Sequence, residues 1–141
     1  YKAAEELAKR PEKRKAIIVL SDGADTQSRR SDEKALKMAI AGQATVYTID
    51  ISTPAEKSRF QNIKVLKNFA EKSGGRFVSA QNGQPLREVF KNLADELRSQ
   101  YTLGYQPTNE AKDGKWREIE VRVARPNLKI RTRQGYHAPK K

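Results

Sequence analysis

The feature that most constrains the fold is a regular alternation of strand-like and helix-like segments over the first hundred residues. Three short segments rich in apolar and β-branched residues predict strands, at residues 16–20, 44–51 and 76–80. Apolar residues at helical spacing predict a helix before the first strand and one after each strand, within residues 1–10, 31–42, 58–74 and 85–97. This order predicts a partial doubly wound α/β fold, in which right-handed helical crossovers join three parallel strands.

The pattern changes after the fourth helix. Residues 101–105 are strand-like, and a polar loop follows them. Two later segments, 116–123 and 128–133, alternate apolar and charged residues around an Arg-Pro-Asn turn, which predicts an antiparallel hairpin. Its predicted dry face consists of Ile119, Val121, Val123, Leu128 and Ile130.

A chain of 141 residues has the size of one ordinary domain. We place an internal boundary near residues 99–106. It separates an α/β part, residues 1–100, from a small antiparallel β extension, residues 101–141, which holds the basic hairpin and a tail. The chain opens inside a helical pattern without an initiator Met, so we expect it to derive from something longer.

The formal net charge is +12, and the last 30 positions hold ten basic and three acidic side chains. Such an excess attracts polyanions. However, Glu118 and Glu120 stand where they can pair with Lys129 and Arg131 across the hairpin, and aromatic side chains do not interleave with the cations. We therefore expect a solvated charged face in preference to a nucleic-acid surface, with polyanion binding as an alternative.

The residue inventory argues against an enzyme. The chain has no cysteine and a single histidine, His137, which we interpret as part of the tail. No Gly-rich phosphate loop, nucleophile elbow or metalloprotease motif occurs, so we name no catalytic or cofactor-binding residue. We expect Tyr101, Tyr105 and Tyr136 to be packing residues. No apolar run approaches the roughly 20 residues that a membrane span needs.

Several segments, taken in order and spacing, resemble the von Willebrand factor A-related proteins of bacteria. They are VLSDGADT, VYTIDI, LKNFAEKSGGRFV, LADELRSQYTLGYQPTN and RVARPNLKIRTRQGYHAP. The resemblance implies a doubly wound α/β domain with a metal-ion-dependent adhesion site at the carboxyl ends of its strands. In this family three loops build the site: a D-x-S-x-S loop, a loop with a Thr, and a later [Ser/Thr]-Asp-Gly loop. Mg²⁺ suits such oxygen ligands and keeps exchangeable positions for a partner's carboxylate.

By this resemblance Asp22 matches the third loop and is a metal ligand, directly or through water. Asp25 is in reach of the same loop, and Ser21 could donate a further oxygen. The alternatives are an Asx turn for Asp22 and a helix cap for Asp25. The chain starts just before the fourth of six expected strands, so the first two loops have no counterpart. The string DISTP, which begins at Asp50, carries Pro54 where the second Ser should stand. Mg²⁺ or Mn²⁺ is thus implied for the intact domain, with weak or no binding by this chain.

The resemblance also bears on the apolar strand at residues 16–20. In the family this strand lies centrally, and its neighbour, the first strand, is missing here, so its edge must be covered by something. We expect a non-enzymatic, adhesion-type protein-binding module. The alternatives are an assembly piece that pairs or self-associates through strand edges, and polyanion binding by the hairpin. The resemblance favours an exported location, periplasmic or extracellular, while the residues themselves leave the compartment open.

Overall fold

The computed structural model describes residues 1–21, 31–52, 63–80 and 86–140 and has an α/β fold. The helices are α1 (Lys2–Ala8), α2 (Asp32–Ala41), α4 (Ile63–Ser73) and α5 (Leu86–Arg98). The strands are β1 (Lys15–Ser21), β2 (Ala44–Asp50), β3 (Phe77–Ser79), β4 (Trp116–Glu118) and β5 (Gly135–His137).

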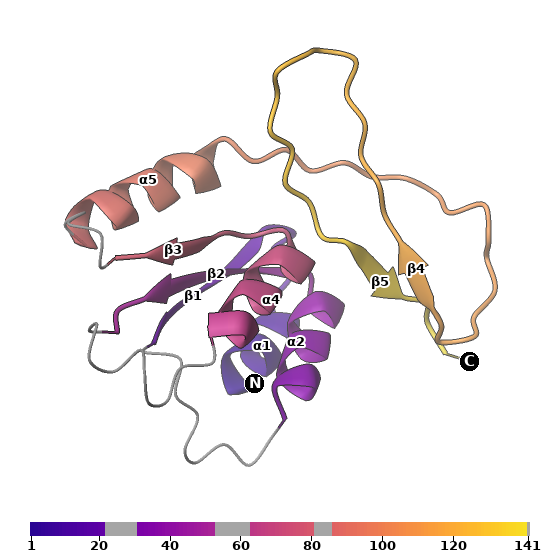
Figure 1. The fold of residues 1–141 in the computed structure, drawn as a ribbon. Helices are drawn as coiled ribbons and strands as arrows, with labels where there is room; N and C mark the ends of the chain where they lie inside the picture. The colour runs from indigo at the N-terminus through magenta and orange to yellow at the C-terminus, as the bar shows by residue number, and fades with distance from the viewer. Residues whose placement is uncertain (22–30, 53–62, 81–85, 141) are drawn as a thin grey trace.

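The first three strands form a parallel sheet in the order β1-β2-β3. Lys15 pairs with Ala44 and Ser21 with Asp50, while Asp50 also pairs with Ser79 on the other side. Helices α1, α2 and α4 cover one face of this sheet, and α5 covers the other (Figure 1). The predicted parallel sheet of βα units is confirmed.

Local signals explain where the helices begin and end. The side chain of Ser31 caps α2 by accepting a hydrogen bond from the backbone N–H of Lys34 at 3.4 Å. Helix α4 ends at Gly74, whose φ of +84° favours glycine. The next residue, Gly75, lies so close to the backbone of Val46 in β2 that a Cβ atom would collide with it. The glycine pair therefore both ends the helix and lets the chain return closely to the sheet.

The core has two clusters, one on each face of β2. Tyr47 and Ile49 pack against Val89 and Leu93 of α5. On the opposite face, Val46 packs with Ala4 of α1 and Ala39 of α2. β2 is therefore the central strand. β1 lies at one edge of the described sheet.

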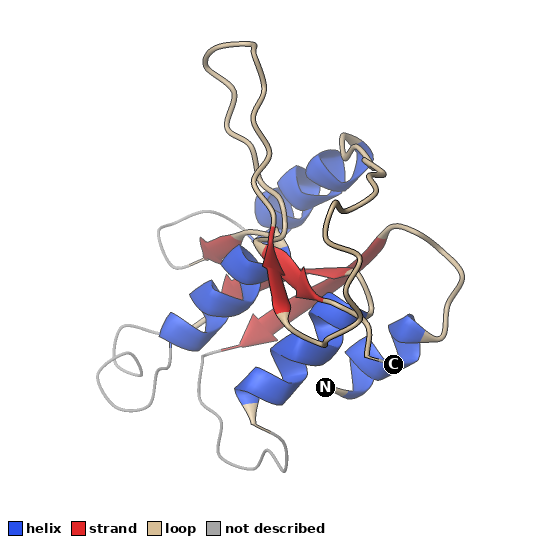
Figure 2. Cartoon of the chain, turned by 90° about the vertical axis from the view of Figure 1, so that its right-hand side faces the viewer, coloured by secondary structure: helices blue, strands red, loops and turns tan. Residues whose placement is uncertain are grey.

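The extension forms a second, antiparallel sheet of β4 and β5, with Trp116 opposite His137 and Glu118 opposite Gly135. Here the structure corrects the prediction. Residues 101–105 contain no strand, and residues 119–134, which we call the arm, contain none either. One backbone hydrogen bond continues the pairing, from the N–H of Ile119 to the carbonyl of Gln134 at 2.9 Å. Beyond it the arm projects from the molecule (Figure 2).

The prediction of a dry hairpin face is also wrong. Ile119 and Val121 are half-buried, but the exposed fractions of Val123, Leu128 and Ile130 are 48%, 55% and 41%. The contacts between the arm and the α/β part lie at residues 131–134, where Arg131 pairs with Glu96 and Gln134 bonds to Lys72. The alternating residues farther out therefore have no layer to bury against.

Aromatic residues and the histidine of the extension also differ from expectation. Tyr101 is 92% exposed and Tyr105 is exposed, so neither is a packing residue, whereas Tyr136 is half-buried beneath the Arg133 guanidinium, 5.9 Å from its ring centre. His137 belongs to β5 and not to a tail, and its ring meets Trp116 edge-on at 5.2 Å between centroids.

Candidate functional site

Polar residues end each parallel strand at the same edge of the sheet. β1 ends at Ser21, β2 at Asp50 and β3 at Ser79, and these three are neighbours in the register. In folds of this class, ligands bind beyond the carboxyl ends of the strands. Of the predicted metal ligands, Ser21 lies at this edge, whereas Asp22 and Asp25 fall outside the described residues.

Asp50 is the central group of this edge. Its side chain is fully buried, and one carboxylate oxygen accepts hydrogen bonds from the N–H of Ser52, at 3.0 Å, and from the Ser52 hydroxyl. The other carboxylate oxygen accepts a longer hydrogen bond from the Ser79 hydroxyl at 3.4 Å. Since a buried carboxyl group needs hydrogen-bond partners, the two serines hold the Asp50 side chain in place at the sheet edge.

Backbone hydrogen bonds extend the sheet just past these residues. The N–H of Ile51 donates to the carbonyl of Ser21 at 3.1 Å, and the N–H of Ala80 donates to the carbonyl of Asp50 at 2.9 Å. The strand ends are thus held side by side.

The edge is chemically suited to a hard cation but is incomplete within the described residues. Its groups are hydroxyl and carboxylate oxygens, the ligand type that Mg²⁺ prefers. No cluster of three or more His, Cys, Asp or Glu side chains occurs among the described residues. Asp50 itself is hydrogen-bonded to Ser52 and Ser79.

From the sequence, Asp50 was noted only as the first residue of the DISTP string, with no predicted role. The structure adds Ser52 and Ser79, which sequence reasoning missed. A signal for Ser52 was present, because a Ser two positions after an Asp at a strand end fits an Asx turn. The Ser79 contact had no local signal, because it joins residues 29 positions apart.

The basic side chains of the extension form other ion pairs than the predicted ones across the hairpin. Glu120 pairs with Arg122, two residues further along the arm, at 2.8 Å instead of across the hairpin. Arg131 reaches helix α5 and pairs with Glu96 at 2.6 Å, while Arg76 lies 3.6 Å from the same carboxylate. The physical reason is that these arm residues lack a closed ladder to hold facing side chains together. These ion pairs reduce the free positive charge that the extension offers to a polyanion.

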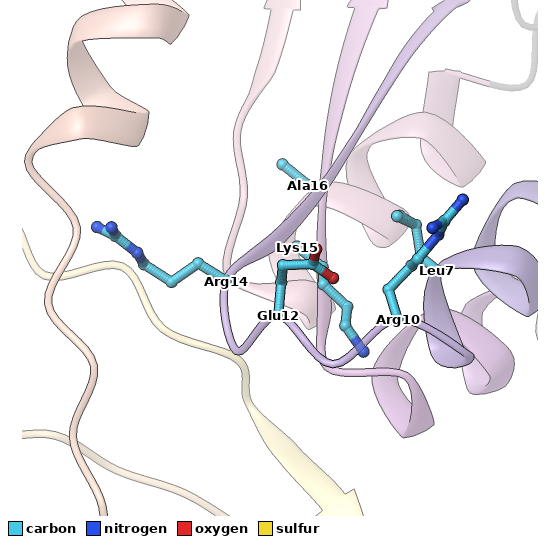
Figure 3. Close-up of a pocket in the computed structure, with 6 residues that line it drawn as sticks. All are labelled: Leu7, Arg10, Glu12, Arg14, Lys15 and Ala16. Carbon is cyan, nitrogen blue, oxygen red and sulfur yellow. The ribbon is translucent and has the colours of Figure 1, made fainter.

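A shallow hollow of about 310 Å³ lies at the opposite, amino end of β1. Its lining includes the three cations Arg10, Arg14 and Lys15 together with Glu12. Arg10 and Arg14 point in opposite directions (Figure 3). The cations do not converge on one point, so the hollow is not a formed anion site.

No protein-family model matches the chain, and no curated protein matches it. Among solved structures, it is similar to the crystal structure of an uncharacterized membrane-spanning protein from Vibrio fischeri, with 23% identity and a TM-score of 0.50. The matched region covers 58% of this chain and 46% of that one, so the chain spans less than half of its structural neighbour. A likeness of this level shows a shared fold. In the described part of this chain, no helix is long and apolar enough to cross a bilayer.

Proposed function

We propose that the chain is part of a von Willebrand factor A-like, non-enzymatic module that binds a protein partner at the carboxyl edge of its parallel sheet. The observation that carries the proposal is the pairing of Ser21 with Asp50 at this edge. Asp22 follows Ser21 directly in the sequence, so the Ser-Asp-Gly motif begins beside a buried carboxylate that two serines hold.

In this proposal Asp22 is the direct ligand of Mg²⁺ or Mn²⁺, with Ser21 and Asp25 as further oxygen donors. Asp50 contributes negative potential and a fixed strand end. A divalent cation with few protein ligands keeps exchangeable positions, and a carboxylate of the partner can fill one of them. The few ligands in this chain imply weak metal affinity, which rises when the partner or further parts of the domain complete the shell.

An exported location, periplasmic or extracellular, accompanies this function through the same family resemblance. Binding of polyanions by the extension is less well supported, because Arg117, Arg122 and Arg131 already pair with Asp113, Glu120 and Glu96. A steep loss of polyanion binding between low and moderate salt would revive that alternative.

The test is a thermal melt of the chain in EDTA, Mg²⁺ and Mn²⁺, beside the isosteric variant Asp22→Asn. At a metal concentration 100 times the dissociation constant, binding adds about 2.7 kcal/mol to the free energy of unfolding. For a chain of this size that raises the midpoint by several degrees. We expect the rise in the parent chain and its loss in Asp22→Asn.

Glu110→Gln is the matched control, because Glu110 is an exposed carboxylate in the extension that pairs with Gln106. It should keep the metal response of the parent chain. An equal response in Asp22→Asn and in the parent would place the metal elsewhere, and no response in the parent at millimolar metal would remove the metal from the proposal.

A further inference from the structure

The outer part of the arm extends away from the α/β part. Every residue from 122 to 130, a segment that we call the tip, is exposed. The contacts that hold the arm lie at its base, where Gln134 bonds to Lys72 and Arg131 pairs with Glu96. Figure 2 shows the tip at the far end of this projection. The tip is therefore the part of the arm that meets an approaching surface first.

The arm leaves the molecule far from the candidate metal site. Its base lies at the amino end of the parallel sheet, where Gly74, which precedes β3, contacts the backbone of Thr132 and Arg133. The described strands end at the opposite edge, at Asp50 and Ser79. A ligand of the tip is thus independent of a ligand at the carboxyl edge of the sheet.

The tip combines apolar and basic side chains. Val123, Leu128 and Ile130 are exposed apolar residues. Arg125 and Lys129 lie among them in the sequence, and neither forms an ion pair within the described residues. The tip holds three basic residues and no acidic one. Such a surface is complementary to a partner that is both anionic and apolar.

A tight turn brings the two limbs of the arm together at the tip. Pro126 fixes its own φ at about −65°, and Asn127 has a φ of +63°, which together are typical of a type II turn. The register of β4 and β5, carried along the arm, would place Val123 opposite Ile130. The apolar side chains of the tip therefore gather around one turn.

We propose that the tip docks the chain on the surface of an anionic lipid bilayer. Val123, Leu128 and Ile130 enter the boundary between the headgroups and the acyl chains, the depth at which interfacial helices bury their apolar faces. Arg125 and Lys129 stay at the level of the lipid phosphates, because their long apolar stems let the charged ends reach back to the polar layer. The rest of the chain remains outside the bilayer.

The size and charge of the tip favour a bilayer over a folded protein as the occupant. A stable protein interface takes about 800 Å² and about 20–30 residues from each partner, whereas the tip has nine residues on a narrow projection. A bilayer needs no shape complementarity, because lipids rearrange around inserted side chains. The chain also carries a net charge of +12, and residues 121–134 contain no Asp or Glu. An anionic surface therefore attracts the tip and the whole chain together.

Binding through so few side chains should be weak and reversible. We expect an association constant on the order of 10⁴ M⁻¹, as for a single acyl chain that enters a bilayer. Added salt should weaken the binding, because it screens the attraction between the cations and the anionic lipids. Vesicles of phosphatidylcholine alone should bind much less of the chain than vesicles of equal parts phosphatidylcholine and phosphatidylglycerol.

The apolar part of the proposal is tested by co-sedimentation with these two kinds of vesicle. Leu128→Ser keeps every charge and should weaken binding to the anionic vesicles at least fivefold, an estimate that follows from the usual gain on burying a leucine. Leu103→Ser is the matched control, because Leu103 is 71% exposed but lies outside the arm. It should bind like the parent chain. Equal losses in the two variants would overturn the role of the tip.

The basic part is tested by the double variant Arg125→Gln with Lys129→Gln. Each basic residue near an anionic surface contributes roughly a factor of five to binding, so the pair should cost more than tenfold. Lys37→Gln with Lys91→Gln removes the same charge from exposed positions of α2 and α5. This control should keep most of the binding. A loss as large as that of the tip variant would mean that net charge alone drives the association, which overturns the proposal.

Insertion itself is measured with a polarity-sensitive fluorophore, which a cysteine-free chain accepts at one introduced site. The label on Leu128→Cys should shift to the blue on anionic vesicles, whereas the label on Leu103→Cys should not. All measurements are made in EDTA, so failure of the metal proposal does not affect them. Absence of binding to anionic vesicles at low salt overturns the proposal. Binding without a shift at position 128, competed by soluble heparin, overturns it in favour of a soluble polyanion.

Discussion

The α/β part and the extension both carry apolar residues in a regular pattern but bury them very differently. Ile49 and Leu93 of the α/β part are fully buried. In the described extension, Ala138 is the buried apolar residue, while Leu128 and Ile130 of the arm are exposed. The difference is the presence of a second layer, since helices cover both faces of β2, whereas the described contacts of the arm with the α/β part lie at its base, residues 131–134. Periodicity alone thus does not make a core.

The extension is held at its base by a few contacts with the α/β part. The N–H of Gln134 donates to the carbonyl of Lys72 at 3.2 Å, and Arg131 pairs with Glu96 of α5. Gly74 also lies directly against the backbone of Thr132 and Arg133. These contacts hold residues 131–134, the base of the arm, and leave the rest of the arm without support from the α/β part.

The largest effect should come from opening the core of the α/β part. Leu93→Ala removes a fully buried side chain that packs against Tyr47 and Ile49, and it should cost about 2–5 kcal/mol in the free energy of unfolding. Leu128→Ala, the same change on the arm, should stay within about 0.5 kcal/mol. Urea denaturation measures both. Similar losses in the two variants would mean that the arm is buried in solution.

The next effect should come from the glycine beneath the extension. Gly74→Ala would place a Cβ atom 2.5 Å from the backbone N of Arg133, at a φ of +84° that disfavours side chains. We expect a loss of about 1–3 kcal/mol and faster amide exchange in β4 and β5. Gly104→Ala is the control, because no atom lies within 4 Å of its added Cβ. Unchanged exchange in Gly74→Ala would show that β4 and β5 do not depend on this contact.

A smaller effect should come from the ion pair between α5 and the arm. Glu96→Gln keeps the side-chain shape but removes the charge that faces Arg131 and Arg76. Because these side chains are only partly exposed, we expect a loss of about 0.5–1 kcal/mol at low salt that shrinks at high salt. Amide exchange around Arg131 should rise. Asp95→Asn, which affects the exposed pair with Arg98, should change neither stability nor exchange measurably.

The smallest effect concerns alkaline pH and Tyr47. Burial, and next the nearby Glu96 carboxylate, raise the pKa of the Tyr47 phenol above its ordinary value, although the hydrogen bond from Gln100 lowers it. The unfolded chain therefore loses this proton first. The stability that the protonated Tyr47 phenol contributes to the folded state is fully present below about pH 10 and is lost as the pH rises through the folded-state pKa. In urea titrations between pH 9 and 11, Tyr47→Phe should lose stability less steeply, and an equal slope would contradict this.

Short-range patterns were enough to predict the order of the strands and helices of the α/β part and its parallel sheet, and local signals at Ser31 and Gly74 agree with the helix ends. Each depends on a few neighbouring residues, through periodicity, capping or a backbone angle. The metal role of Asp22 stays a prediction, since that residue lies outside the described part of the chain.

Three predictions about the extension were wrong for one shared reason. They are the dry face of the arm, the strand at residues 101–105 and the ion pairs across the hairpin. Burial and charge pairing depend on which groups arrive from distant parts of the chain. Glu96 forms an ion pair with Arg131, 35 positions away in the sequence, and Ser79 donates a hydrogen bond to Asp50, 29 positions away. Local sequence sets the period of a segment. The layer that packs against the segment exists only in the folded chain, and the presence or absence of that layer decides whether the segment is a buried strand or an exposed arm.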